Sequence, residues 1–161
     1  RHSSSAASDV YKRQLLPNKF STYFATAGGI DRISGSSFND VIIGPDANNK
    51  HGTLRFDAGA GDDIVSPGRG GSIGLLGEGK DKLVIGFDSL FGQTIILDFD
   101  QKSDSVYIEE GIQHKINKKN PSLCLFFPKA EDGKDPYSTK YILLSSESSQ
   151  SWDDISIKTI G

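Results

Sequence analysis

Aspartate recurs at a fixed place in short glycine-rich segments of this chain. Four segments of nine residues begin at positions 26, 35, 58 and 76, and the eighth residue of each is aliphatic. Their sixth residues are Asp31, Asp40, Asp63 and Asp81. Glycine tolerates positive φ angles, so such segments wind tightly and expose backbone carbonyls beside the carboxylates. Hard oxygen ligands of this kind favour Ca²⁺ over zinc or copper, which makes calcium the expected cofactor.

Each segment combines a turn with a short strand. The glycine-rich half predicts the turn. The half around the aliphatic residue predicts a strand with one apolar side chain facing inward and its neighbours facing outward. A single segment cannot bury this side chain, whereas stacked segments can. The sequence therefore predicts an all-β chain in which such segments stack on one another.

The nine-residue pattern resembles G-G-x-G-x-D-x-U-x, the haemolysin-type calcium-binding repeat of RTX proteins. Glycine occupies the fourth place in three of the four segments, at Gly29, Gly61 and Gly79. The resemblance implies a parallel β-roll, the RTX-type solenoid, in which two segments make one coil and positions two segments apart stack directly.

The resemblance also implies where calcium would bind. The length of two segments separates Asp63 from Asp81, and the same length separates Asp31 from Asn49. Stacked strands lie about 4.8 Å apart, and oxygens on opposite sides of a Ca²⁺ ion lie roughly 5 Å apart, so an ion fits between two coils. The residues expected at the main site are Asp63, Asp81, Gly59, Gly61, Gly77 and Gly79. A second, weaker site is expected around Asp31, Asp40 and Asn49.

The pattern is interrupted in two places. The segment Gly44–Gly52 carries Asn49 in place of aspartate, and Pro67–Leu75 carries Ser72 there. The interval between the segments that begin at positions 35 and 58 is not a multiple of the segment length. A solvated glycine and aspartate loop that binds nothing tightly therefore stays open as an alternative.

The chain divides into four parts. Residues 1–14 resemble a non-native leader or artefact, 15–25 form a lead-in, 26–86 carry the calcium-binding repeats, and 87–161 form a strand-rich C-terminal cap. A separate small β domain is the alternative for the last part. The strands expected there are Gln93–Phe99, Ser105–Glu109, Leu123–Phe127, Lys140–Leu144 and Ile155–Lys158.

Composition and motifs exclude several classes of protein. A formal net charge of −3 argues against nucleic-acid binding, and a single cysteine excludes an intramolecular disulfide. No stretch approaches the roughly 20 apolar residues of a membrane-spanning helix.

Several matches to catalytic and metal-binding motifs are incomplete. Ser72 fits G-x-S-x-G, but a glycine-rich turn follows it where the nucleophile elbow requires a helix. A P-loop-like segment ends in Asp81 instead of Ser or Thr, and an EF-hand-like spacing around Asp98 lacks the required glycine. The histidines show no zinc spacing. The chain is therefore expected not to be an enzyme.

The resemblance implies a calcium-binding module of a secreted, extracellular bacterial protein that folds on binding calcium and supports type I export. Calcium ions and the type I secretion machinery are the expected partners. One alternative is the C-terminal export region of a secreted protease or lipase whose catalytic domain is missing here. Another is a surface-layer or adhesin component.

Overall fold

The computed structural model describes residues 22–25, 32–44, 54–68, 71–116, 124–128, 142–144 and 155–160. These residues form strands and one short 3₁₀ helix, η1 (Phe87–Phe91). The strands are β1 (Thr22–Ala25), β2 (Arg32–Ser36), β3 (Asp40–Ile43), β4 (Leu54–Gly59), β5 (Ile64–Ser66), β6 (Ser72–Leu75), β7 (Lys82–Ile85), β8 (Thr94–Ile96), β9 (Ser105–Glu109), β10 (Ile112–Ile116), β11 (Cys124–Pro128), β12 (Ile142–Leu144) and β13 (Ser156–Ile160).

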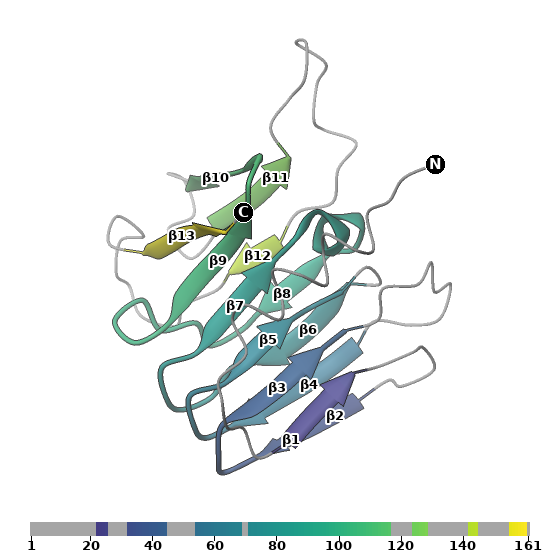
Figure 1. Cartoon of the computed structure of the whole chain (residues 1–161), viewed down its shortest axis with the longest axis vertical. Coiled ribbons are helices and arrows are strands. Elements are labelled where there is room, and N and C mark those ends of the chain that lie inside the picture. Colours follow the sequence, from purple (N-terminus) through teal and green to yellow (C-terminus); the bar gives the residue numbers. More distant parts are fainter. Residues whose placement is uncertain are drawn as a thin grey trace.

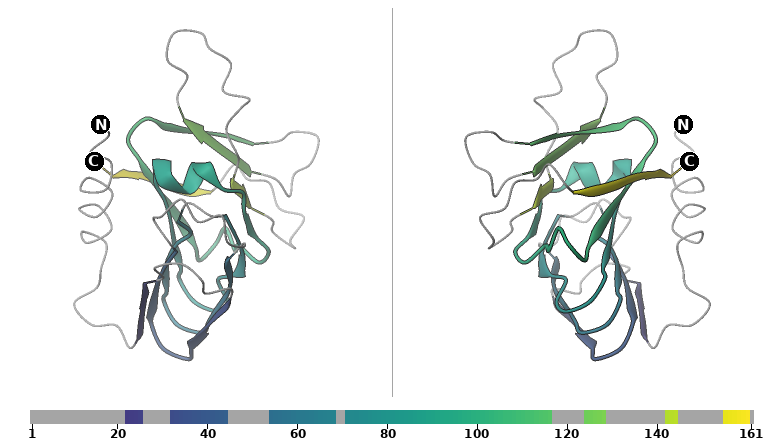
Figure 2. Two further views of the ribbon diagram at one scale, coloured as in Figure 1. Left: turned by 90° about the vertical axis from the view of Figure 1, so that its right-hand side faces the viewer. Right: turned by 90° about the vertical axis from the view of Figure 1, so that its left-hand side faces the viewer.

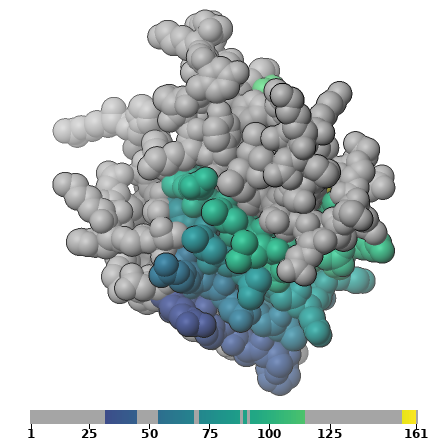
Figure 3. Space-filling model, turned by 180° about the vertical axis from the view of Figure 1, so that it is seen from behind, coloured from purple at the N-terminus to yellow at the C-terminus, as the bar shows by residue number. Residues whose placement is uncertain are grey.

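The strands form two sheets, and from β2 to β9 consecutive strands alternate between them (Figure 1). The first sheet has the order β1-β3-β5-β7-β9-β13, and the second has the order β10-β11-β12-β8-β6-β4-β2. All pairs along β1 to β9 are parallel. Figure 2 shows the two sheets edge-on with turns between them, and Figure 3 shows the opposite side, where the described residues run from purple to green in chain order. The predicted all-β character is confirmed, with parallel sheets.

The core lies between the two sheets. The aliphatic residue at the eighth place of each sequence segment lies in it: Ile33, Ile42, Val65 and Leu83. Three of these pair in register across β3, β5 and β7, so they form one continuous row. Burial of each such side chain contributes about 1.5–3 kcal/mol to folding. The regular spacing of aliphatic residues in the sequence therefore produces a continuous apolar core between the two sheets.

We call one strand of the second sheet, the turn after it and the next strand of the first sheet a coil. The first three connections from the second sheet to the first have the same length, and the fourth, between register positions 96 and 105, is one residue longer. Eight residues separate register positions 33 and 41, 56 and 64, and 74 and 82. The connections from the first sheet back to the second differ in length, because positions 41 and 56 are further apart in sequence than positions 64 and 74. The irregular interval between the sequence segments therefore lies in the connections that run from the first sheet back to the second. The aspartate-bearing turns, which run from the second sheet to the first, stay in register.

Glycine is required where these turns stack. Gly77 has a φ of +93°, and a Cβ there would lie 1.7 Å from the carbonyl oxygen of Gly59. Gly79 has a φ of +146°, and its Cβ would lie 1.9 Å from the carbonyl oxygen of Gly61. Real side chains never approach a backbone oxygen so closely. The glycines of the repeat therefore allow both the positive φ angles of the turns and the short distance between adjacent coils.

The part after residue 86 extends the same sheets. The five strands expected there are present as β8, β9, β11, β12 and β13, with ends that differ by up to three residues. Strand β10, which pairs antiparallel with β11, and the helix η1 were not anticipated. Within the described ranges, no helix combines the length and the apolar character needed to cross a membrane.

Gly77→Ala should lower the free energy of unfolding by at least about 1 kcal/mol more than Gly111→Ala does. Gly111 has a similar φ of +91°, but its Cβ would meet only the far end of the Phe87 ring, at 3.1 Å. The pair of variants therefore separates backbone strain from the close approach of two turns. Urea denaturation at one fixed calcium concentration measures both. Equal losses would show that the stacking distance does not require glycine.

Candidate functional site

Four aspartates stack in one line along the first sheet, at the ends of the turns that lead into β3, β5, β7 and β9. We call Asp40, Asp63, Asp81 and Asp104 the aspartate column. Each of the last three carboxylates accepts a hydrogen bond from the backbone N–H of the aspartate in the preceding coil. The three N–H to Oδ1 distances are 2.7 Å from Asp40 to Asp63, 2.8 Å from Asp63 to Asp81 and 3.1 Å from Asp81 to Asp104. The column thus links four coils through their own backbone.

The column is buried. The exposed fractions are 1% for Asp40, 0% for Asp63, 0% for Asp81 and 3% for Asp104. A buried carboxylate is costly to ionise unless hydrogen bonds or a counter-charge compensate it. Both oxygens of an ionised carboxylate are acceptors, so both need a partner. The arrangement therefore concentrates negative charge where water is excluded.

The second carboxylate oxygen divides the column into end and central members. The Oδ2 atoms of Asp40 and Asp104 accept N–H bonds within their own turns, from Ser36 and Asp100 respectively. The Oδ2 atoms of Asp63 and Asp81 are buried and have no hydrogen-bond partner in the described part of the chain. Two adjacent coils thus each hold one uncompensated oxygen.

Burial raises the pKa of three column members. The pKa is about 6 for Asp63, about 7 for Asp81 and about 6 for Asp104. In each case desolvation is the largest cause, the N–H bonds received act in the opposite direction, and neighbouring carboxylates raise the pKa further. Near neutral pH, the centre of the column therefore favours either a proton or another positive charge.

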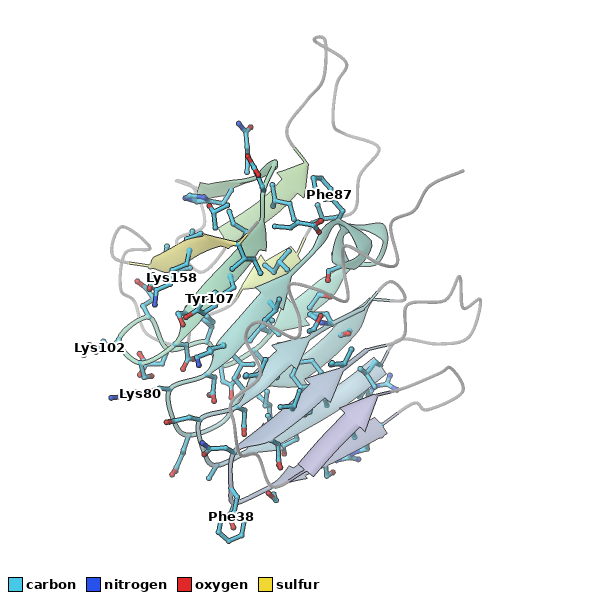
Figure 4. The ribbon with its side chains drawn as sticks, in the orientation of Figure 1. Phe38, Lys80, Phe87, Lys102, Tyr107 and Lys158 are labelled. Atoms are coloured by element: carbon cyan, nitrogen blue, oxygen red, sulfur yellow. The ribbon has the colours of Figure 1, made fainter. Side chains whose placement is uncertain are left out.

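A second line of polar contacts runs beside the column on the exposed side of the turns. The N–H of Asp62 donates to Asn39 Oδ1 at 2.9 Å, and the N–H of Lys80 donates to Asp62 Oδ1 at 2.9 Å. Lys80 and Lys102 extend from this edge of the sheets, and Phe38 extends from the turn nearest the N-terminal strands (Figure 4). Both lines bind adjacent turns to one another, so the turns form a regular surface.

The structure brings together three of the aspartates expected from the sequence, and also the four turn glycines. Asp40 belongs to the same column as Asp63 and Asp81, although the sequence spacing placed it in a separate, weaker site. Gly61, Gly77 and Gly79 lie in the two turns that precede Asp63 and Asp81, and Gly59 ends strand β4 directly before the first of these turns. Asp31 and Asn49 fall outside the described residues.

Asp104 is the column member that the sequence pattern did not assign to the site. The interval from Asp81 to Asp104 equals the interval from Asp40 to Asp63. That repeated interval was a usable signal. It was obscured because the turn before Asp104 lacks the glycines of the repeat and reads instead as a C-terminal element.

The donor chemistry of the site suits a hard cation held partly by the backbone. No three or more His, Cys, Asp or Glu side chains of the described residues gather closely enough to hold a metal by side chains alone. Calcium also accepts backbone carbonyl oxygens and water as ligands. The pair of unpartnered carboxylate oxygens, with glycine turns beside them, fits that requirement.

Ser72 occupies a structural position. It begins strand β6, is buried, and its hydroxyl donates to the carbonyl of Pro67 at 3.1 Å. A strand follows it where a nucleophile elbow requires a helix.

No known protein family matches the chain, and no curated protein matches it. The resemblance to haemolysin-type repeats therefore rests on the chain's own residues.

With divalent cations removed by a chelator, the free energy of unfolding should fall as the pH rises from 5 to 8. The folded pKa values of Asp63, Asp81 and Asp104 lie above the ordinary value of 3.8. Their stabilising contribution is complete below about pH 4 and is lost as the pH rises through about 6 to 7. We expect a loss of at least about 1 kcal/mol, measured by urea denaturation at three pH values.

Asp81→Asn should flatten this pH profile, because it removes the carboxylate with the most raised pKa. Asp62→Asn is the matched control, since Asp62 is an exposed neighbour of the column. A chelated wild-type protein that gains stability from pH 5 to pH 8 would contradict the electrostatic account of the column.

Proposed function

We propose that the chain is a calcium-binding module folded as a parallel β-roll of the haemolysin type, with calcium bound between the coils of Asp63 and Asp81. One observation carries the proposal. Asp63 and Asp81 stack in adjacent coils, are fully buried, and each has an Oδ2 atom without a hydrogen-bond partner in the described structure. A cation between them would supply the missing partner to both oxygens.

The electrostatics of the column support a divalent cation. Burial and the neighbouring carboxylates raise the pKa of Asp63 and of Asp81 because the ionised forms lack compensation. Positive charge at this place would favour the ionised forms of both residues. Removal of their mutual repulsion would stabilise the stack, so binding and folding would be coupled.

The ligand types favour calcium among divalent cations. Carboxylate and carbonyl oxygens suit Ca²⁺ and Mg²⁺, whereas structural zinc sites use cysteine and histidine. Magnesium requires near-ideal octahedral geometry with short bonds, whereas calcium accepts more ligands in flexible arrangements. Residues that would hold the ion are Asp63, Asp81 and carbonyls of the turns at Gly59, Gly61, Gly77 and Gly79. Calcium there would act structurally, by neutralising charge and joining two coils.

Secretion is the cellular role that fits such a module. Extracellular calcium modules often bind with dissociation constants of about 10⁻⁴–10⁻³ M. The chain would be less stable where calcium is scarce and would gain stability after export, consistent with the type I secretion implied by the repeat resemblance. A C-terminal region of a secreted protease or lipase would use the same module, and a longer reading frame with a catalytic motif would favour that role.

Calcium should raise the melting temperature and the far-UV circular dichroism β signal of the whole chain, with a midpoint in the range of about 0.1–1 mM. The gain reflects the joining of coils that otherwise repel one another. Magnesium at the same concentrations should produce less than a tenth of the effect. The double variant Asp63→Asn, Asp81→Asn should lose the calcium response, because it retains the shape and the Oδ1 acceptors while removing both charges.

Asp62→Asn is the matched control and should respond to calcium like the wild type. An unchanged melting temperature up to about 10 mM calcium would overturn the proposal. The column would then be a metal-independent element of a parallel β fold, stabilised by protonation.

A further inference from the structure

We infer that the aspartate column binds a single calcium ion, because the turns at both of its ends are closed by their own backbone. This inference rests on the proposed function and adds the number of ions and the residues that limit it. The four column members look equivalent in sequence, since each precedes an apolar strand. Their second carboxylate oxygens are not equivalent in structure.

The N-terminal end of the column is closed at Asp40. The N–H of Ser36, four residues earlier, donates to Asp40 Oδ2. The Ser36 hydroxyl accepts the N–H of Phe38 at 3.2 Å, which holds this turn in its closed form. The oxygen that a cation would use is therefore already engaged within the turn.

The C-terminal end is closed more completely at Asp104. Oδ1 accepts the N–H of Asp81, and Oδ2 accepts the N–H of Asp100 at 2.9 Å. The N–H of Asp104 donates to the Asp100 carbonyl at 2.8 Å and does not continue the column. The Asp100 side chain accepts the N–H of Lys102 and the hydroxyl of Ser103, which stabilises the turn.

Among the residues that the structure describes, strand β13 provides no further ligand beyond Asp104. Strand β13 pairs with β9 and places Ser156 beside Ser105, so the position next to Asp104 belongs to Ile155. Ile155 is partly buried and packs against the apolar core. The column therefore ends where an apolar side chain replaces the carboxylate.

The two central turns carry glycine four residues before each aspartate, and no N–H bond to the aspartate Oδ2 is present in them. Gly59 precedes Asp63 and has a φ of +101°, and Gly77 precedes Asp81 and has a φ of +93°. The N–H of Gly77 donates to Asp98 Oδ2 at 2.9 Å, away from Asp81. Both central Oδ2 atoms consequently stay without partners in the described structure, and they belong to adjacent coils. One ion between these coils satisfies both.

The test counts bound calcium by native mass spectrometry and isothermal titration on the whole chain, with calcium as the only added ligand. The double variant Asp63→Asn, Asp81→Asn should bind one ion fewer than the wild type. Asp40→Asn and Asp104→Asn should bind the same number as the wild type, with affinities that change less than about threefold. Each asparagine retains its Oδ1 acceptor, while its NH2 group replaces the Oδ2 atom that accepts the N–H bond within the turn.

The outcomes separate this inference from the proposed function. Loss of one ion in Asp104→Asn or Asp40→Asn, or loss of two ions in the double variant, would overturn the single-ion inference and leave calcium binding intact. A wild-type chain that binds no calcium would overturn both. The two end variants decide the question even if the double variant does not fold, because they test the ends of the column directly.

Discussion

The structure depends on the hydrogen bonds from backbone N–H groups to carboxylates that run through the aspartate column. Each coil donates the N–H of one aspartate to the carboxylate of the next, so the four turns keep one spacing and one register. The column also buries four carboxylates, and burial raises the pKa of Asp63, Asp81 and Asp104. A stack that satisfies backbone donors in this way concentrates charge at its centre, and that charge is the basis of the proposed calcium site.

This constraint applies only to the turns that run from the second sheet to the first. The first three turns that carry the column have the same length and the fourth is one residue longer, and stacked glycines allow the backbones of the central turns to approach closely. The connections on the other side differ in length between coils, and one of them contains the helix η1. Loops tolerate insertions where no ladder crosses them, so the irregular sequence spacing lies there and leaves the column in register.

Much of the fold followed from the residue pattern. The aliphatic eighth position predicted the core row that contains Val65 and Leu83, and β-branched and aromatic runs predicted five strands after residue 86. Strand β10 was missed because its residues Ile112–Ile116 mix polar and apolar types and gain stability by pairing with β11. Asp104 was missed because its turn has no glycine signature. In both cases a contact outside the segment itself, with β11 or with Asp81, decided the outcome.

The sequence by itself determined the chemistry that is available: carboxylates, flexible turns and one aliphatic side chain per strand, repeated often enough to stack. Only the tertiary structure decided which aspartates lie together and which of their oxygens lack partners. Strand register brings Asp40 to Asp63 despite the irregular spacing, and the direction of each turn's N–H closes the ends at Asp40 and Asp104 while leaving Asp63 and Asp81 open. The reason is physical: a hydrogen bond depends on the position and direction of a donor, and only the packing of one coil on the next sets both.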